Sequence, residues 1–392
     1  MKTNRPVSGR AREPMRITFV LPHAGLAGGI RVVAIYAEAL QARGHKVVIL
    51  SSPYRLHGIR AKIENCWHRL MLRVTGKDEP SHLNDIDVEH RRLPSPDYLD
   101  AADIPPSDVV ISTWWETAEQ LAALNLPGAT KVYFLQHHEA HDGQPIDRVN
   151  ATWRLPMQKI VVAQWLADLA RNEFGDSTAI NVPNAVDLEQ FSVPARGKQS
   201  KPTVGMMYSN ARFKGCDICI KAIEIARRTI PDLQVAAFGM AEFPEETKNL
   251  PRDTHYTQMP EQDRIKDIYA SCDAWLFGSR SEGFGLPLLE AMACRTPVIA
   301  TPAGAAPELV GQGGGMLVKS EDAEDMAAAI VRIARMQEGE WKRLSDRALE
   351  IAKPYTWEHA SDLFEAALRA AVERSQRDAS QNASRPSAVA AA

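Results

Sequence analysis

The sequence of 392 residues lacks the features that define several classes of protein. No apolar run approaches the roughly 18 residues that a membrane-spanning helix needs. The formal net charge of -3 provides no excess of positive charge, which argues against a nucleic-acid-binding protein that works through bulk charge. The basic first residues are not followed by an apolar segment, so we expect a disordered tail over 1–14 rather than a secretory signal.

Cysteine is scarce as well. The odd count of five and the absence of a regular spacing fit a reducing cytoplasm, where we expect the protein to act. These residues are Cys66, Cys216, Cys219, Cys272 and Cys294. Cys216 and Cys219 form a C-x-x-C pair, but a zinc site would need a second pair at a suitable spacing. We therefore interpret both as small residues on the inner side of a helix.

What the chain does contain is an alternation of apolar, strand-like runs with helical patterns. The runs lie at 16–21, 46–50, 108–112, 131–135 and 159–163, and again at 203–208, 233–239, 272–278 and 296–301. Continuous apolar strands separated by helices indicate parallel sheets that are covered on both faces. A polar stretch at 192–202 interrupts the alternation. The sequence therefore predicts an α/β protein with two similar, doubly wound domains.

The predicted boundaries follow from this interruption. We expect a Rossmann-like domain over 15–196 and a second one over 197–355, with a ligand cleft between them. A strongly helical stretch follows at 356–375. The polar, low-complexity residues 376–392 are expected to be disordered.

The stretch SRSEGFGLPLLEAMACRTPVIATPAG, residues 279–304, combines a glycine-rich turn with two glutamates. Pro287 is typical of a first helical turn, so a helix is expected to begin there. Backbone N–H groups just before it would form an anion site at the positive end of the helix dipole. The residues of this turn are Gly283, Phe284, Gly285 and Leu286.

The two glutamates flank that anion site. Glu290, about one turn into the helix, would accept hydrogen bonds from vicinal hydroxyls such as those of a ribose. Glu282 would accept them at the other end of the ligand. An amide cradle between two hydroxyl acceptors favours a nucleotide diphosphate sugar, and the alternative is an ordinary capped helix with a surface glutamate.

The segment EGFGLPLLE, residues 282–290, resembles the E-x7-E signature of retaining glycosyltransferases with the GT-B fold, specifically glycosyltransferase family 4 (group 1). Further segments resemble the family in the same order, over roughly residues 15–375. These are GLAGGIRVV (25–33), VVAQWLAD (161–168), VPNAVDLEQF (182–191) and YTWEHASDLF (355–364). The resemblance implies two Rossmann-like domains that face a cleft, with a C-terminal helix that packs back on the N-terminal domain.

The resemblance also implies roles for residues of the second domain. The glycine loop and Glu290 would bind the phosphates and the ribose, and Glu282 would contact the transferred sugar. Lys214, in the segment MMYSNARFKG, would bind the diphosphate and act in catalysis. Tyr208 stands where the family usually has an arginine, so Arg212 is the candidate substitute.

Two further candidates come from the first domain. The same resemblance implies a histidine near the anomeric carbon as a catalytic residue. This would be His137, in KVYFLQHHEAHDG, with His138 as the alternative. The spacing of this histidine cluster matches no common metal-ligand pattern. Gly28 and Gly29 would let the backbone approach the sugar or the diphosphate, or would merely form a tight turn.

The resemblance implies a retaining glycosyltransferase that transfers a sugar to a glycan or a lipid-linked acceptor. Lys214, with Arg212 as a candidate, and the helix dipole at 283–286 would stabilise the leaving oxygen, so no metal or other cofactor is expected. The alternatives are an epimerase or phosphorylase of the same fold, or a non-catalytic nucleotide-sugar-binding subunit of a polysaccharide assembly complex. Residues 54–77 read as a basic amphipathic helix, which would place the protein at the inner face of the cytoplasmic membrane. A solvated helix is the alternative there, and no nucleic-acid partner is expected.

Overall fold

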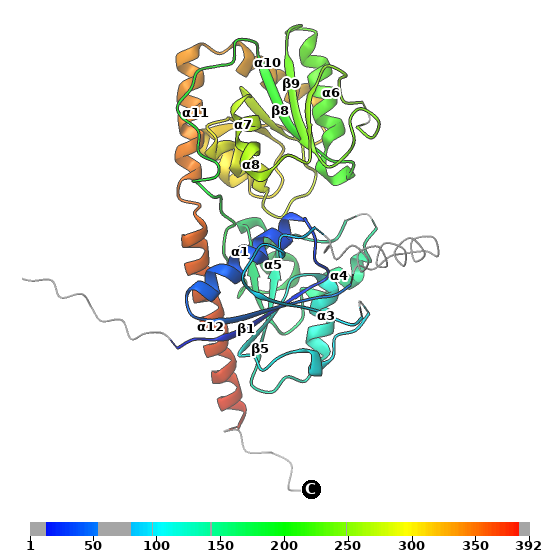
Figure 1. Ribbon diagram of the computed structural model, residues 1–392, viewed down its shortest axis with the longest axis vertical. Coiled ribbons are helices and arrows are strands. Elements are labelled where there is room, and N and C mark those ends of the chain that lie inside the picture. Colours follow the sequence, from blue (N-terminus) through cyan, green and yellow to red (C-terminus); the bar gives the residue numbers. More distant parts are fainter. Residues whose placement is uncertain (1–12, 54–79, 96, 142, 248, 384–392) are drawn as a thin grey trace, which may run out of the picture. The chain divides into compact units, whose positions relative to one another are not determined.

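The computed structural model describes residues 13–53, 80–95, 97–141, 143–247 and 249–383 (Figure 1). The segment 54–77, for which a membrane contact was predicted, lies outside the described residues. Contacts divide the chain into two compact units. One comprises the described residues up to 134, together with 155–159 and those from 364 onward, and the other comprises 135–154 and 160–363.

The first sheet has seven strands in the order β3-β2-β1-β4-β5-β6-β7. The strands are β1 (Arg16–Leu21), β2 (Lys46–Ser51), β3 (Glu89–Arg92), β4 (Val109–Ser112), β5 (Thr130–Leu135), β6 (Gln158–Val161) and β7 (Ile180–Asn181). Strand β1 pairs in parallel with both β2 and β4. The chain therefore leaves β1 toward one side and returns on the other, which places a topological switch point between β1 and β4.

The second sheet has six strands in the order β10-β9-β8-β11-β12-β13, and all of its pairings are parallel. The strands are β8 (Thr203–Tyr208), β9 (Gln234–Gly239), β10 (His255–Gln258), β11 (Ala274–Phe277), β12 (Val298–Ala300) and β13 (Gly315–Leu317). Its switch point lies between β8 and β11. Both sheets are thus doubly wound, as the alternation of apolar runs predicted.

Helices account for a large share of the remaining described chain. They are α1 (Gly28–Ala42), α3 (Trp115–Ala123), α4 (Ile146–Thr152), α5 (Gln164–Phe174), α6 (Cys216–Arg227), α7 (Ile265–Ala270), α8 (Leu286–Ala293), α9 (Ala306–Leu309), α10 (Ala323–Arg335), α11 (Glu338–Ala352) and α12 (Trp357–Ala383). Short turns of helix are η1 (Ala101–Asp103), η2 (Arg212–Lys214), η3 (Gln262–Arg264) and η4 (Val310–Gly314). In the described part of the chain, no helix is both long and apolar enough to cross a bilayer.

The long helix α12 runs beside β1 and β5 in Figure 1. Its Phe364 stacks on Tyr36 with ring centroids 4.3 Å apart and meets Phe134 edge to face at 5.1 Å. Such aromatic packing adds about 1 kcal/mol per pair beyond the area that is buried. The helix continues to Ala383, so the prediction of disorder from residue 376 was wrong for 376–383. Residues 376–381 are exposed and polar, so composition alone does not distinguish this end of a helix from a disordered tail.

Candidate functional site

The candidate site forms around the carboxyl ends of β8 and β11, the two strands that flank the switch point of the second sheet. Ligands in doubly wound sheets bind at such a position. Strand β8 leads into the loop 209–215, which ends with Lys214. Strand β11 leads into the loop 278–285, which carries Glu282 and the predicted glycine turn.

Lys214 and Glu282 meet directly. The Lys214 ammonium lies 2.7 Å from the Glu282 carboxylate, and the Ser279 hydroxyl donates to the same oxygen at 2.9 Å. Glu282 is only 8% exposed, so a buried carboxylate is neutralised by a cation and a hydroxyl. A cavity of about 20 Å³, enough for a single water molecule, is lined by all three of these residues.

The glycine turn has the predicted backbone. Gly285 has φ of +99°, a left-handed conformation that favours glycine, and α8 begins at the next residue with Pro287 in its first turn. In the described part of the chain, none of the N–H groups of 283–286 donates a hydrogen bond. These donors and the dipole of α8 make the loop suited to an anion.

Gly283 is required by close packing. A Cβ atom at this position would collide with the Gln136 carbonyl oxygen, which belongs to the same compact unit. The Gly283 carbonyl accepts a hydrogen bond of 2.7 Å from the Trp165 indole. The turn is therefore held on both sides, and Trp165 is a contact that the sequence did not reveal.

Glu290 is buried on α8 at 7% exposure, not displayed on the surface. The Tyr269 hydroxyl donates to its carboxylate at 2.9 Å. The alternative of a capped helix with a surface glutamate is therefore wrong. That Glu290 binds a ribose stays a prediction, and any such hydroxyl would share the carboxylate with Tyr269.

The Nε2 atom of His137 lies 3.2 Å from the Ser281 hydroxyl. Burial lowers the pKa of His137 to about 4, against the opposing attraction of Glu282, so the ring is neutral at pH 7. His138 instead makes a 3.0 Å hydrogen bond to the Asn150 side chain and packs edge to face on Trp153. Of the two histidines, His137 is the one that contacts the loop of Glu282.

The remaining predicted residues are placed as follows. Arg212 is an exposed residue of η2, next to Phe213 and Lys214. Gly28 and Gly29 are the first residues of α1, in the other compact unit. Cys216 and Cys219 are buried free thiols on α6, as predicted. Within the described ranges, no group of three or more His, Cys, Asp or Glu side chains is arranged to hold a metal ion.

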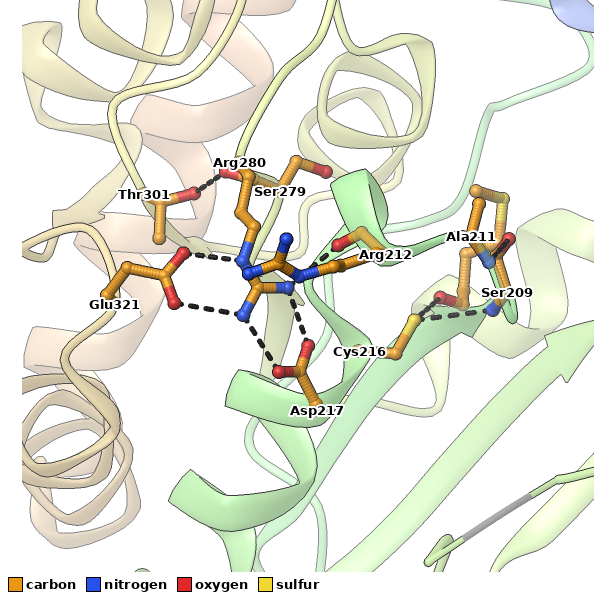
Figure 2. Close-up of polar contacts among 10 residues, drawn as sticks. Ser209, Ala211, Arg212, Cys216, Asp217, Ser279, Arg280, Thr301 and Glu321 are labelled. Carbon is orange, nitrogen blue, oxygen red and sulfur yellow. Dashed lines mark hydrogen bonds and ion pairs between the residues drawn. The ribbon is translucent and has the colours of Figure 1, made fainter. Parts of the chain in front are cut away.

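Arg280 was also missed by the sequence analysis. Arg280, between the end of β11 and Glu282, contacts Asp217 at 2.7 Å and also pairs with Glu321 (Figure 2). The signal was an arginine inside the segment GSRSEGFG. Its partners are far away in the chain, however, so its contacts could not be inferred from spacing.

Comparison with known proteins finds similarity to glycosyltransferases. Residues 202–336 match the family model described as glycosyl transferases group 1. The D-inositol 3-phosphate glycosyltransferase of Mycobacterium marinum is 30% identical over 208 residues, which are 48% of this chain and 44% of that protein. A GDP-mannose-dependent alpha-(1-6)-phosphatidylinositol monomannoside mannosyltransferase of Mycolicibacterium smegmatis is 28% identical over 193 residues, 43% of this chain and 50% of that protein. The matches thus span half or less of these relatives.

Among solved structures, the Anabaena protein Alr3699/HepE in complex with UDP and glucose aligns with a TM-score of 0.68 at 18% identity. The alignment covers 91% of this chain and 100% of that one. A likeness at this identity establishes the fold over nearly the whole chain. The chain therefore has the GT-B fold, and the family model of the group 1 glycosyl transferases matches its residues 202–336.

Proposed function

We propose that this protein is a retaining glycosyltransferase that moves a sugar from a nucleotide diphosphate sugar to a glycan or a lipid-linked acceptor without a metal ion. The observation that carries the proposal is the position of the Lys214 ammonium and of the N–H groups of 283–286, which donate no hydrogen bond among the described residues. They follow adjacent strands, at the switch point of one sheet. A diphosphate is the ligand whose charge suits both.

The chemistry of transfer explains why cations are needed there. Cleavage of the bond between sugar and diphosphate adds negative charge to the departing oxygen. Lys214 and the dipole of α8 would stabilise that charge, the task that a divalent cation performs in metal-dependent enzymes. One preorganised donor of this kind contributes roughly 3 kcal/mol, or about a hundredfold in rate.

The Lys214–Glu282 ion pair suggests how the site receives its donor. On binding, the diphosphate would draw the ammonium away from Glu282. That carboxylate would keep the hydrogen bond from Ser279 and would accept hydroxyls of the sugar in place of Lys214. Glu282 is buried, so it requires such a replacement partner.

His137 would position and stabilise the reacting sugar. Its pKa of about 4 makes it a weak base at neutral pH, which disfavours a role as general base. We propose instead that the departing phosphate receives the proton of the acceptor hydroxyl. The sugar would then be transferred with retention of configuration and without a covalent intermediate on the protein.

The names of the relatives guide the choice of substrates. GDP-mannose is the donor named for one of them, and UDP and glucose are bound in the Anabaena structure. The acceptors named are an inositol phosphate and a phosphatidylinositol mannoside. We therefore propose GDP- and UDP-sugars as the first donors to test. We also propose that the protein acts at the cytoplasmic face of a membrane.

The test is nucleotide-sugar binding and slow donor hydrolysis over UDP-, GDP-, dTDP- and ADP-sugars, with EDTA present. Thermal stabilisation by one nucleotide class, together with hydrolysis about a hundredfold slower in Lys214→Ala, is the expected result. Lys221→Ala is the matched control, because Lys221 is exposed on α6, which begins just after the Lys214 loop. Binding without hydrolysis in the wild type would favour a non-catalytic subunit, and hydrolysis abolished by EDTA would exclude metal independence.

A further inference from the structure

Arg280 uses its whole guanidinium group in contacts within the protein. Nε donates to Glu321, and Nη2 donates to Glu321 and Asp217 at 2.9 and 2.8 Å. Nη1 donates to Asp217 and to the Arg212 carbonyl oxygen, both at 2.7 Å. All five N–H groups of the side chain are therefore engaged. Figure 2 shows the guanidinium between the two carboxylates.

These contacts hold the turn that presents Lys214. The Arg280 side chain binds the carbonyl of Arg212, and its backbone N–H donates to the carbonyl of Phe213 at 2.8 Å. Both residues belong to η2, the short 3-10 helix that ends at Lys214. Asp217 lies in the first turn of α6, just beyond Lys214. A single arginine thus fixes the chain before and after the lysine.

The backbone on the far side of Lys214 is equally restricted. Gly215 has φ of +61°, and a Cβ atom there would collide with the Gly278 carbonyl oxygen. The loops that follow β8 and β11 are therefore in backbone contact at this point. Lys214 is held between this contact and the two carbonyl oxygens that Arg280 binds.

We propose that Arg280 is a positioning residue, which fixes the Lys214 ammonium for the diphosphate of the donor. This inference rests on the proposed function, since it assumes that Lys214 binds the diphosphate. Arg280 does not contact the donor itself, because all its N–H groups already have partners. Its side chain acts by holding the Arg212 carbonyl of η2 and the first turn of α6 at fixed distances.

The role requires an arginine. A lysine has one ammonium in place of a planar fork, so it cannot pair with two carboxylates in bidentate fashion and also reach the Arg212 carbonyl. The carboxylates of Asp217 and Glu321 are 65% and 59% exposed. Exposed ion pairs contribute little stability. The network therefore serves the geometry of the loop more than the overall stability of the fold.

The experiment compares Arg280→Lys with a matched arginine. Arg227 also forms a fork with a carboxylate, Asp253, and binds the Leu233 carbonyl, and it lies at the opposite end of α6 from the Lys214 loop. Dissociation constants of UDP, GDP, UMP and GMP are measured by calorimetry for the wild type, Arg280→Lys and Arg227→Lys. The ratio of diphosphate to monophosphate affinity is the readout, because a merely structural role would change both nucleotides alike.

We expect Arg280→Lys to lower the affinity for the nucleoside diphosphates by about tenfold or more, since small displacements of a binding group are costly. The affinity for the monophosphates should fall by less than about threefold. Arg227→Lys should leave both affinities unchanged. In a Lys214→Ala background, Arg280→Lys should add less than about a twofold change, because its effect is transmitted through Lys214. Asp217→Asn and Glu321→Gln each remove the negative charge from one ion pair of Arg280, so they should change the affinity ratio in the same direction by a smaller amount.

Equal weakening of both nucleotides, no weakening, or additivity with Lys214→Ala would overturn the role of Arg280. The proposed function fails by a different result. If the wild type binds none of the nucleotides, or if Lys214→Ala binds them as the wild type does, the assignment of Lys214 is wrong whatever Arg280 does.

Discussion

The first loop after the opening strand of each sheet is held by a different chemistry. In the seven-stranded sheet, the loop after β1 runs from residue 22 to 27. The Gly25 carbonyl accepts from the His82 N–H at 3.2 Å and from the Ser81 hydroxyl at 3.4 Å. The Leu26 carbonyl lies 3.2 Å from Nε2 of His82. These partners are a backbone amide, a hydroxyl and an imidazole.

In the six-stranded sheet, the equivalent loop after β8 runs from residue 209 to 215. Two of its carbonyls accept from Arg280: the Arg212 carbonyl accepts from the guanidinium, and the Phe213 carbonyl accepts from the backbone N–H. The guanidinium is itself fixed by two carboxylates. Charge-assisted hydrogen bonds are shorter and stronger than neutral ones. The comparison teaches that the same element of the fold is fixed rigidly where it presents a cation and is held more weakly where it presents glycines.

Of the substitutions that test this difference between the two loops, Gly215→Ala is expected to lower the free energy of unfolding most. An alanine there must adopt a left-handed conformation and displace the Gly278 carbonyl, which we expect to cost about 3 kcal/mol of the free energy of unfolding. Gly25→Ala is the matched change in the other loop. A Cβ at Gly25 would make only an ordinary contact with the His23 ring, 3.5 Å away, so a change within about 0.5 kcal/mol is expected.

Urea unfolding followed by tryptophan fluorescence measures both variants. Equal destabilisation by the two alanines would show that the loop after β8 is no more restricted than the loop after β1. A strongly destabilised Gly25→Ala variant would show the reverse order.

A second contrast concerns histidines of the two units. Burial lowers the pKa of both His137 and His82 below the ordinary value of 6.5, to about 4 for His137. Such a group binds protons more readily in the unfolded chain. Its contribution to stability is therefore complete above pH 6.5 and is lost as the pH falls toward 4. For His137 the loss amounts to about 3 kcal/mol over that window.

Replacing the histidine removes this dependence. We expect the free energy of unfolding of His137→Gln to fall less than that of the wild type between pH 6.5 and 4. His82→Gln should reduce the loss by a smaller amount. Urea midpoints at several pH values provide the measurement, and parallel pH profiles for wild type and His137→Gln would contradict the lowered pKa of His137.

The sequence predicted the central strands of both sheets and missed their edges. The four strands that were not predicted, β3, β7, β10 and β13, are the outermost strands of the two sheets. Edge strands have one side exposed, so they need neither length nor a continuous apolar run. The segment EHRR of β3 and the segment HYTQ of β10 are largely exposed, and only pairing with β2 and β9 makes them strands.

The site was predictable to a similar extent. The turn at 283–286 follows from glycine and proline chemistry that acts within a few residues, and Lys214 follows from resemblance to a family. The contacts of Arg280 join it to Asp217 and Glu321, 63 and 41 residues away in the chain. Such contacts depend on how β8, β11 and β13 are ordered, which residue spacing does not specify.

The smallest predicted effect comes from two substitutions of Glu321 that distinguish its ion pair from its backbone strain. Glu321 has φ of +58°, a conformation that costs a non-glycine residue about 1 kcal/mol and that glycine adopts freely. Glu321→Ala and Glu321→Gly both remove the ion pair with Arg280, but only the glycine also removes the strain. We expect Glu321→Gly to be about 1 kcal/mol more stable than Glu321→Ala, while both weaken nucleoside diphosphate binding equally. Unfolding in urea and calorimetry with UDP or GDP test the two parts separately.

If the glycine variant kept wild-type affinity for the diphosphate while the alanine variant lost it, strain at residue 321, and not its charge, would control the Lys214 loop. The contrast between a charged loop and a neutral one would then no longer explain the difference between the two sheets.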